Sequence, residues 1–472
     1  MRDRLSRFFL PVIMAVCCLF AAYAAVFHAA YFSSSDELAE LLFLQILLAA
    51  IWKYRSRFFP LLLVVFLWAG VLLPLNAAWT SGRWIVLAVG ALAGLVAYAR
   101  DQRHYFATFH LVAFFCVVAA LVSAAVSGYP SLAFLKAMSL LLLFLYGSCG
   151  ARMAVIGREA SFFSQLLLGC ELLIYISAIS YFLFQFEVFG NPNSLGAVMG
   201  VAGAPVLLWG VLVSERPTTR WRRTFAFALA LLLLFSSYAR AGIVAAVASC
   251  VLICVALGRY GLVLRGLGFA LSIATFVAAV VPLHQQSAGS LTSVFVYKGR
   301  REDGLLASRK SVWDEAESAI QQHPWLGSGF GTSPTSSEVV QQSGNFESLR
   351  EATREHGNSY LAITEWVGFA GDIPFLALVI LVAVNVGRAL LEMRRTGNVF
   401  SPVVPLAAVL AAGLLHAAFE DWLFAPGYYL CIFFWSLAFI MVDVLPPSSA
   451  VPAASTAARA WTHGFRTATL GR

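Results

Sequence analysis

Apolar runs long enough to cross a lipid bilayer recur along almost the whole chain. The segment 105–127, for example, contains no lysine, arginine or acidic residue, and a helix of about 20 such residues spans the hydrocarbon core. Charged residues make up only 12% of the chain, against roughly 25% in soluble domains, so a soluble globule is excluded. We predict an all-α, polytopic integral membrane protein with about 12 to 14 transmembrane helices and one large outer loop that contains short helices.

The connections between these runs alternate in charge. If the N-terminus is cytoplasmic, the even-numbered connections and the two termini collect about 22 of the 32 basic residues, which is the distribution that the positive-inside rule favours. We therefore expect both termini in the cytoplasm, and we attribute the net charge of +8 to orientation rather than to a nucleic-acid partner. The runs lie near 9–30, 37–52, 58–76, 83–99, 105–127, 131–149, 162–185, 194–214, 223–239, 241–258, 261–283, 367–387, 400–418 and 426–444.

A polar segment from about 284 to 365 interrupts the membrane pattern on the outer side. With this segment as a loop subdomain (284–366), the chain is predicted to have five parts. The other four are N-terminal transmembrane helices (1–160), a transmembrane core (161–283), C-terminal transmembrane helices (367–444) and a disordered cytoplasmic tail (445–472).

The first half of the loop subdomain is predicted to form a helix. Ser311 and Asp314 have the spacing of a capping box, and Pro324 is expected to end the helix. Trp313, Ala316 and Ile320 form an apolar stripe, which we expect to dock on the membrane domain.

Arg240 and Lys136 are basic residues that lie outside the predicted cytoplasmic connections. Arg240 lies in a polar turn, Ser236-Ser-Tyr-Ala-Arg-Ala-Gly242, and a guanidinium beside hydrocarbon is costly unless it has an anionic partner or water. This makes it a candidate site residue, with a snorkelling arginine as the alternative. Lys136 is a second candidate, which snorkelling explains as well. Asn191-Pro-Asn-Ser-Leu-Gly196 has the composition of a turn followed by a helix N-cap.

The outer segment adds an arginine and a histidine. Arg309 lies near the start of the predicted loop helix, where the helix dipole and its planar donors both favour a phosphate. The string Gly327, Gly329 and Gly331 is interpreted as a flexible turn in preference to an anion-binding loop, because no P-loop sequence follows it. His356 precedes a helix predicted to begin at Asn358 or Ser359, and a positive helix end should keep its imidazole neutral and able to accept a proton.

Several chemistries have no motif in this sequence. There is no Walker A motif, no Asp-x-Asp and no H-E-x-x-H. All eight cysteines lie in apolar stretches, and the histidines show no ligand spacing. No metal and no cofactor are predicted.

Taken together, six short motifs give the chain a family resemblance. Their order and membrane setting resemble the O-antigen ligase and polysaccharide polymerase family over about residues 190–440. The motifs are Asn-Pro-Asn-Ser-Leu-Gly (191–196), Ser-Ser-Tyr-Ala-Arg-Ala-Gly (236–242), Ser-Arg-x-x-x-Trp (308–313), His-Pro-Trp-Leu-Gly-x-Gly-x-Gly (323–331), His-Gly-Asn-Ser-Tyr-Leu (356–361) and Glu-Trp-Val-Gly-Phe-Ala-Gly (365–371).

The resemblance implies a metal-independent glycosyltransferase of the GT-C type in the bacterial cytoplasmic (inner) membrane, with its large loop in the periplasm. Family members move a glycan from undecaprenyl diphosphate to lipid A-core, as ligases, or to another lipid-linked chain, as polymerases. Carried onto this chain, Arg240 and Arg309 would hold the diphosphate, with Lys136 as a weaker candidate. His356 would take the proton of the acceptor hydroxyl, and Asn191, Asn193 and Asn358 belong to the structural motifs.

Two features leave alternatives open. The family often has histidine directly before asparagine, whereas Gly357 intervenes here, so Glu420 is an alternative base. The sequence Glu420-Asp-Trp-Leu-Phe, followed by Gly427-Tyr-Tyr, resembles the exopolysaccharide polymerase branch. The sequence therefore predicts either a ligase or a polymerase. A lipid or solute transporter without chemistry is the alternative of another class, and it predicts paired interrupted helices in two related halves, which the sequence lacks.

Overall fold

The computed structural model describes residues 107–268, 307–333 and 356–445, together with residues 70, 71, 84, 86–96 and 272. Within these residues the chain is helical and has no strand. Several predictions fall outside the described residues. These are the first two predicted spans, most of the third, most of the span 261–283, the parts of the outer segment at 284–306 and 334–355, and the tail beyond 445.

The described helices match the predicted spans in order. The first group contains α6 (Thr108–Val126), α7 (Pro130–Leu145), η1 (Tyr146–Ala151), α8 (Arg152–Val155) and α9 (Glu159–Leu183). The second contains α10 (Pro192–Val198), η2 (Met199–Gly203), α11 (Ala204–Leu212), α12 (Pro217–Ser236) and α13 (Arg240–Ala256). The third contains α16 (Ala307–Gln322), α18 (Ser359–Thr396), α19 (Val403–Ala417) and α20 (Tyr429–Val444).

Five segments of the described chain are long and apolar enough to cross a membrane: Thr108–Val126, Pro130–Ala151, Glu159–Leu183, Pro192–Leu212 and Ser359–Thr396. Four shorter apolar helices accompany them: Val86–Val96, Arg240–Ala256, Val403–Ala417 and Tyr429–Val444. The prediction of an all-α, polytopic membrane protein is confirmed.

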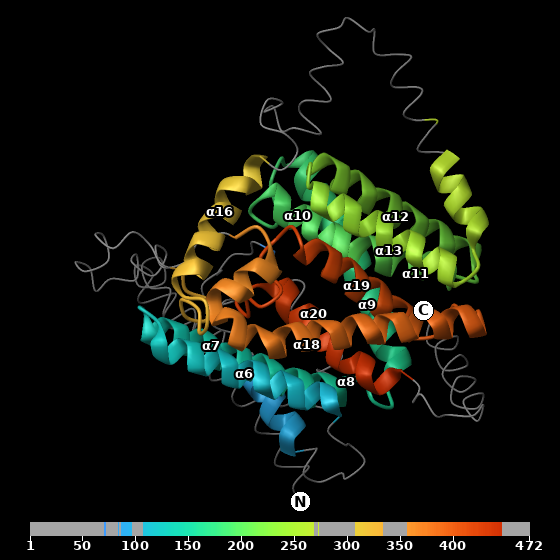
Figure 1. Ribbon diagram of the computed structural model, residues 1–472. Coiled ribbons are helices and arrows are strands. Elements are labelled where there is room, and N and C mark those ends of the chain that lie inside the picture. The colour runs from blue at the N-terminus through green and yellow to red at the C-terminus, as the bar shows by residue number, and fades with distance from the viewer. Residues whose placement is uncertain are drawn as a thin grey trace, which may run out of the picture.

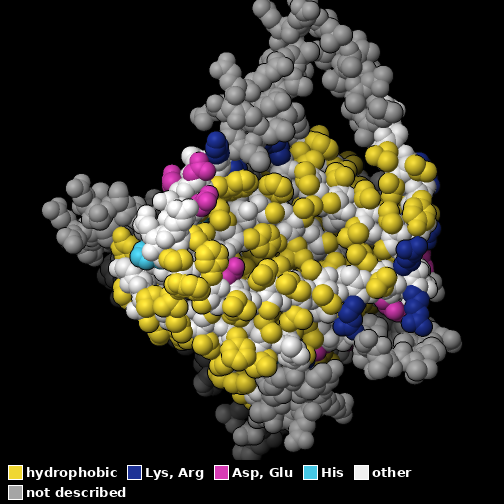
Figure 2. Space-filling model, in the orientation of Figure 1, with side chains coloured by type: hydrophobic (Ala, Val, Ile, Leu, Met, Phe, Trp, Pro, Cys, Tyr) yellow, Lys and Arg dark blue, Asp and Glu magenta, His cyan; other side chains and the backbone are white. Residues whose placement is uncertain are grey.

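Successive spans run in opposite directions, so their connections gather at two ends of the bundle (Figure 1). One end, here named the cavity end, holds α16, the N-termini of α10, α13 and α18, and the turn 418–428. The opposite end, here named the arginine end, holds the connections after α8, α11, α13 and α18. Figure 2 shows hydrophobic side chains over much of the surface between the ends, a group of Lys and Arg side chains where α18 finishes, and acidic side chains over α16.

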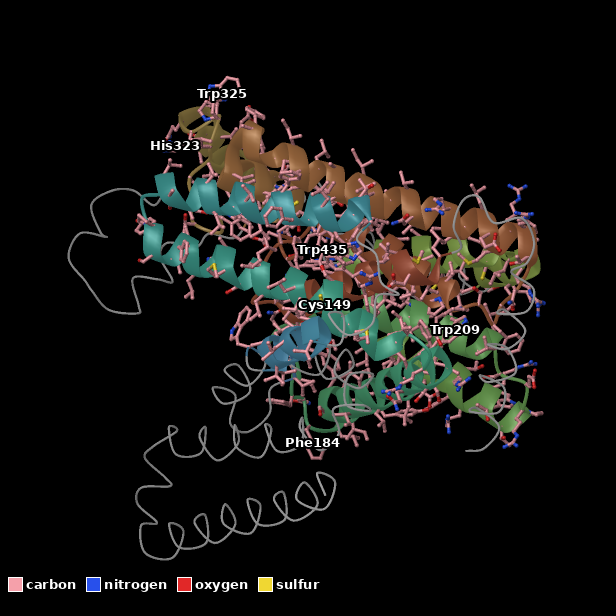
Figure 3. All side chains as sticks on the ribbon, turned by 90° about the horizontal axis from the view of Figure 1, so that it is seen from below. Cys149, Phe184, Trp209, His323, Trp325 and Trp435 are labelled. Atoms are coloured by element: carbon pink, nitrogen blue, oxygen red, sulfur yellow. The ribbon has the colours of Figure 1, made fainter. Side chains whose placement is uncertain are left out.

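Helix α20 forms the centre of the packing. Every residue from Tyr429 to Met441 is buried, and Trp435 lies inside the bundle in Figure 3. The ring of Phe439 packs edge-on against Phe109 of α6 and Phe144 of α7. Because residues 429–441 have no exposed polar face, this part of α20 is positioned by apolar and aromatic packing.

Glycine faces bring α10 and α13 into close contact. A Cβ atom on Gly242 would lie 2.5 Å from the carbonyl oxygen of Gly196, and one on Gly200 would lie 2.4 Å from the carbonyl oxygen of Gly242. Small residues at helix interfaces allow backbones to approach in this way. The first turns of the two helices therefore lie side by side at the cavity end.

Helix α18 is interrupted at Gly368, whose φ of 66° and ψ of 174° are not helical. The break leaves backbone groups without helical partners, and the loop after α16 binds them. Ser328 and Gly329 donate backbone hydrogen bonds to the carbonyl oxygens of Glu365 and Trp366, at 2.9 and 3.1 Å. In the other direction, the amide of Phe369 donates to the carbonyl oxygen of Pro324 at 2.8 Å. We call this paired region, 324–329 with 365–370, the α18 latch.

The latch explains why two of the recognised motifs are rich in glycine. A Cβ atom on Gly327 would lie 2.3 Å from the carbonyl oxygen of Trp366, and one on Gly368 would lie 2.4 Å from the carbonyl carbon of Trp325. Gly327, Gly329 and Gly331 all have positive φ, and the amide of Gly329 is used by the latch. The prediction of a flexible turn is therefore wrong for residues 324–329, because they are hydrogen-bonded to the broken helix. Figure 3 shows His323 and Trp325 at the extremity of the molecule beside the start of α18.

Candidate functional site

A cavity of about 320 Å³ opens at the cavity end between α10 and the turn that joins α19 to α20. Its wall combines acidic, amide and aromatic side chains, so it offers both apolar surface and polar groups that can orient a ligand. The lining residues are Asn191, Asn193, Ser194, Ala197, His416, Glu420, Asp421, Trp422, Ala425 and Tyr428.

Arg309 and Glu420 form an ion pair at this cavity. The Nη2 atom of Arg309 donates to Oε1 of Glu420 at 2.5 Å, and the two side chains are 19% and 20% exposed. Arg309 lies in the first turn of α16, as predicted, and α16 packs against α18. The structure thus brings together an arginine and a glutamate that the sequence singled out separately.

His356 is held between two carboxylates. Its Nε2 lies 3.1 Å from Oε2 of Glu365, and its Nδ1 lies 3.4 Å from Oδ2 of Asp421. The backbone amide of His356 also donates to Oδ2 of Asp421 at 2.7 Å. The imidazole is buried and packs edge-on against Trp366, whereas Asp421 reaches the cavity.

These carboxylates change the protonation expected for His356. Burial lowers the pKa of the imidazole, but the hydrogen bonds to Asp421 and Glu365 and their charges outweigh it, so the pKa lies above its ordinary value. For Asp421, burial raises the pKa, and the hydrogen bonds from His356 outweigh it, so the pKa lies below the ordinary range. The prediction that the helix end keeps His356 neutral is wrong, because it considered the helix dipole and missed the two carboxylates.

Arg240 is the first residue of α13, at the cavity end. It follows a tight turn in which Tyr238 has a φ of 53° and Ser237 donates from its hydroxyl to the carbonyl oxygen of Leu234 at 2.8 Å. The predicted polar turn is confirmed. A cation at a helix N-terminus opposes the helix dipole, so this position favours an anionic ligand nearby. Arg240 is not among the residues that line the cavity.

The motif asparagines begin two helices. Asn191 accepts a hydrogen bond from the amide of Ser194 at 2.7 Å and so caps α10. Asn358 accepts from the amide of Tyr360 at 2.9 Å and caps α18. The N-cap predicted in 191–196 and the helix start predicted at Asn358 or Ser359 are confirmed. Asn193 lies in the first turn of α10 at the cavity.

Lys136 contacts the loop after α16. Its Nζ donates to the carbonyl oxygen of Gly331 at 2.5 Å, and it is not among the cavity-lining residues. A role for Lys136 at a diphosphate stays a prediction.

The helix that carries Arg309 differs from its predicted form at one end. It begins at Ala307 rather than at a capping box at Ser311, and it ends at Gln322, just before Pro324. The buried residues Ala316 and Ile320 lie on its inner face, as expected. The extra first turn is what allows Arg309 to project from a helix.

Two functional candidates were missed in the sequence. Glu365 stood in a recognised motif and Asp421 beside Glu420, but their pairing with His356 depends on the fold. An acidic residue at the start of an apolar run was the available signal for Glu365, since such residues are rare in membrane segments. Among the described residues, no group of three or more His, Cys, Asp or Glu side chains could hold a metal ion.

The fold and this site define a class: a multi-pass, all-α membrane protein that places arginine, histidine and carboxylate side chains together at one end of its bundle. Residues 225–376 match the family described as O-antigen ligase. The chain therefore carries an O-antigen ligase domain, of the type found in membrane glycosyltransferases that act as ligases or polymerases. The match includes Arg240, Arg309, His356 and Glu365. No curated protein matches the chain.

Proposed function

We propose that this protein transfers a glycan from undecaprenyl diphosphate to a hydroxyl of an acceptor, with lipid A-core or a similar glycolipid as the acceptor. The observation that carries the proposal is the cavity at which Arg309 and Glu420 are paired and beside which Asp421 holds His356. The family match supports the same reaction class.

In this reaction the acceptor oxygen attacks the anomeric carbon of the glycan, and the bond from that carbon to the diphosphate oxygen breaks. Negative charge develops on the departing undecaprenyl diphosphate. Arg309 offers planar guanidinium donors that match phosphate oxygens, and Arg240 adds a second cation at a helix N-terminus. Such donors stabilise the leaving group because they are fixed before the charge develops.

The acceptor hydroxyl must give up a proton as its oxygen attacks. His356 is the first candidate for the base. It does not line the cavity, so the proton would reach it by way of Asp421, which contacts its Nδ1 and lines the cavity. Glu420 is the second candidate. A diphosphate competes with Glu420 for the donors of Arg309, so donor binding would release this carboxylate toward the acceptor.

The polymerase reaction is the second candidate function. Four of the residues that resemble the exopolysaccharide polymerase branch line the cavity: Glu420, Asp421, Trp422 and Tyr428. An acceptor site built from these side chains would suit the growing end of a lipid-linked chain as well as a core sugar.

We place the cavity end on the periplasmic face of the bacterial inner membrane. Arginines at residues 152, 158, 216, 394 and 395 lie at the opposite end, and an excess of such residues marks the cytoplasmic side. The undecaprenyl chain would then lie in the outer leaflet, with its diphosphate at the level of α16.

A deletion strain tests the function. Loss of the protein should leave lipid-linked glycan accumulating, with surface polysaccharide that is missing in the ligase case and shortened in the polymerase case. Wild-type protein should restore the polymer, and Arg309→Ala should not, although both insert in the membrane to equal levels. Normal surface polysaccharide in the deletion strain would refute the proposal.

A further inference from the structure

Gly357 separates His356 from Asn358 and adopts a backbone conformation that L side chains rarely take. Its φ is +61°, in the left-handed region that favours glycine. The residue is buried, and it lies between two residues that hold the turn 420–423. On one side His356 donates its amide to Asp421, and on the other side Ser359 donates its hydroxyl to the carbonyl oxygen of Glu420 at 2.5 Å.

The guanidinium of Arg309 occupies the space where a side chain of residue 357 would be. A Cβ atom on Gly357 would lie 2.3 Å from Nη1 of Arg309, 2.9 Å from Cδ and 3.0 Å from Cζ. The other terminal nitrogen, Nη2, is the atom that donates to Glu420. Arg309 therefore reaches Glu420, a residue of the cavity wall, by lying against the bare α-carbon of Gly357.

We infer that Gly357 is a positioning residue for Arg309: the missing side chain fixes where the guanidinium meets its anionic ligand. The inference rests on the proposed function, in which that ligand is the diphosphate of the glycan donor. Gly357 touches no reacting atom and acts through the arginine alone.

The geometry separates this role from a simple role in folding. The atoms that a new Cβ would meet belong to the far end of a flexible side chain, so the arginine can move aside while the backbone stays in place. A substitution should therefore leave a folded, inserted protein with a displaced guanidinium. Its remaining cost is the strain of a side chain at positive φ.

A second glycine provides a matched control for that strain. Gly397, which follows α18 at the arginine end, has a φ of +60°, and a Cβ atom there would meet nothing within 4 Å. Gly357→Ala and Gly397→Ala thus impose the same backbone strain, and only the first meets Arg309. Gly357→Asn adds a variant that tolerates positive φ better and still carries a Cβ atom.

The test is binding of undecaprenyl diphosphate, without sugar, to the purified full-length protein in nanodiscs. We expect Gly357→Ala and Gly357→Asn to weaken binding about tenfold, the loss that follows from misplacing one charge-assisted hydrogen bond. Gly397→Ala should bind like the wild type. In an Arg309→Ala background, Gly357→Ala should weaken binding no further, because non-additivity marks two residues that act through one contact.

Each other result has a defined meaning. If Arg309→Ala weakens binding and Gly357→Ala matches Gly397→Ala, the positioning role is refuted and the proposed function stands. If Gly357→Ala weakens binding equally with and without Arg309, the glycine acts by another route and the inference is again refuted. If Arg309→Ala binds like the wild type, the diphosphate site itself is refuted, and the positioning role falls with it.

Discussion

The carboxylate of Glu365 lies 3.1 Å from Nε2 of His356, and the two side chains are 0% and 1% exposed. Glu365 belongs to the segment of α18 just before its break, and His356 to the turn before the same helix. The latch that binds the broken backbone therefore also fixes the position of this carboxylate against the imidazole.

The first prediction concerns the pH dependence of transfer. A base must be neutral to accept a proton, so if His356 is the base, kcat should fall at low pH with an apparent pKa above the ordinary value for histidine. Glu365→Gln removes a charge that stabilises the imidazolium, so this acid limb should move to lower pH. Asp372→Asn, on the same helix, is the control and should leave the limb in place. An acid limb that Glu365→Gln does not move would favour Glu420 as the base.

The second prediction concerns stability and pH. The pKa of His356 is raised in the folded protein, so its contribution is complete below the unfolded pKa and is lost as the pH rises through the folded pKa. The pKa of Asp421 is lowered, so its contribution is present above the unfolded pKa and is lost as the pH falls through the folded pKa. The loss of Tm in Asp421→Asn should therefore be greatest between about pH 4 and 6.5. A loss that is constant from pH 3 to 9 would contradict the pairing.

The sequence predicted the helices and their ends well where the signals are local. The N-caps at Asn191 and Asn358 depend on one side chain and the amides that follow it, so they could be recognised without the fold. The spans could be recognised by length and apolar composition alone.

Relationships between distant segments could not be predicted in this way. Asp421 is far from His356 in sequence, and the break in α18 is stable only because the loop from Pro324 to Gly329 binds it. The protonation of His356 could not be predicted from the helix dipole for the same reason, since the charges that decide it come from Asp421 and Glu365 in other segments.

The third prediction concerns the latch. Gly368→Ala should destabilise the protein by more than about 3 kcal/mol, because it places a side chain at positive φ against the backbone of Trp325, which cannot move aside. Thermal unfolding in detergent measures the effect. Gly387→Ala is the matched control in the same helix, where a Cβ atom meets nothing within 4 Å, and it should be neutral or stabilising by about 0.5 to 1 kcal/mol. Equal Tm values for the two variants would contradict the latch.

The fourth prediction separates stability from activity. At the arginine end, Arg152 donates from Nε and Nη2 to both carboxylate oxygens of Asp443, each at 2.5 Å. Asp443→Asn leaves the buried arginine without its counter-charge and should cost about 3 kcal/mol of stability. Asp443 lies roughly 20 Å along α20 from the cavity, so the transfer rate per folded molecule should not change. A raised KM for the donor would show that the two ends are coupled.

The most direct test of the central claim is transfer by purified protein in proteoliposomes, with undecaprenyl-diphosphate-linked glycan as donor and separate lipid A-core and lipid-linked glycan acceptors. Release of undecaprenyl diphosphate should depend on an acceptor, and Arg309→Ala should lower the rate at least about a hundredfold, while Asp443→Asn retains it per folded molecule. The acceptor that is consumed distinguishes ligase from polymerase. Transfer at the wild-type rate by Arg309→Ala, or no release with either acceptor, would contradict the account.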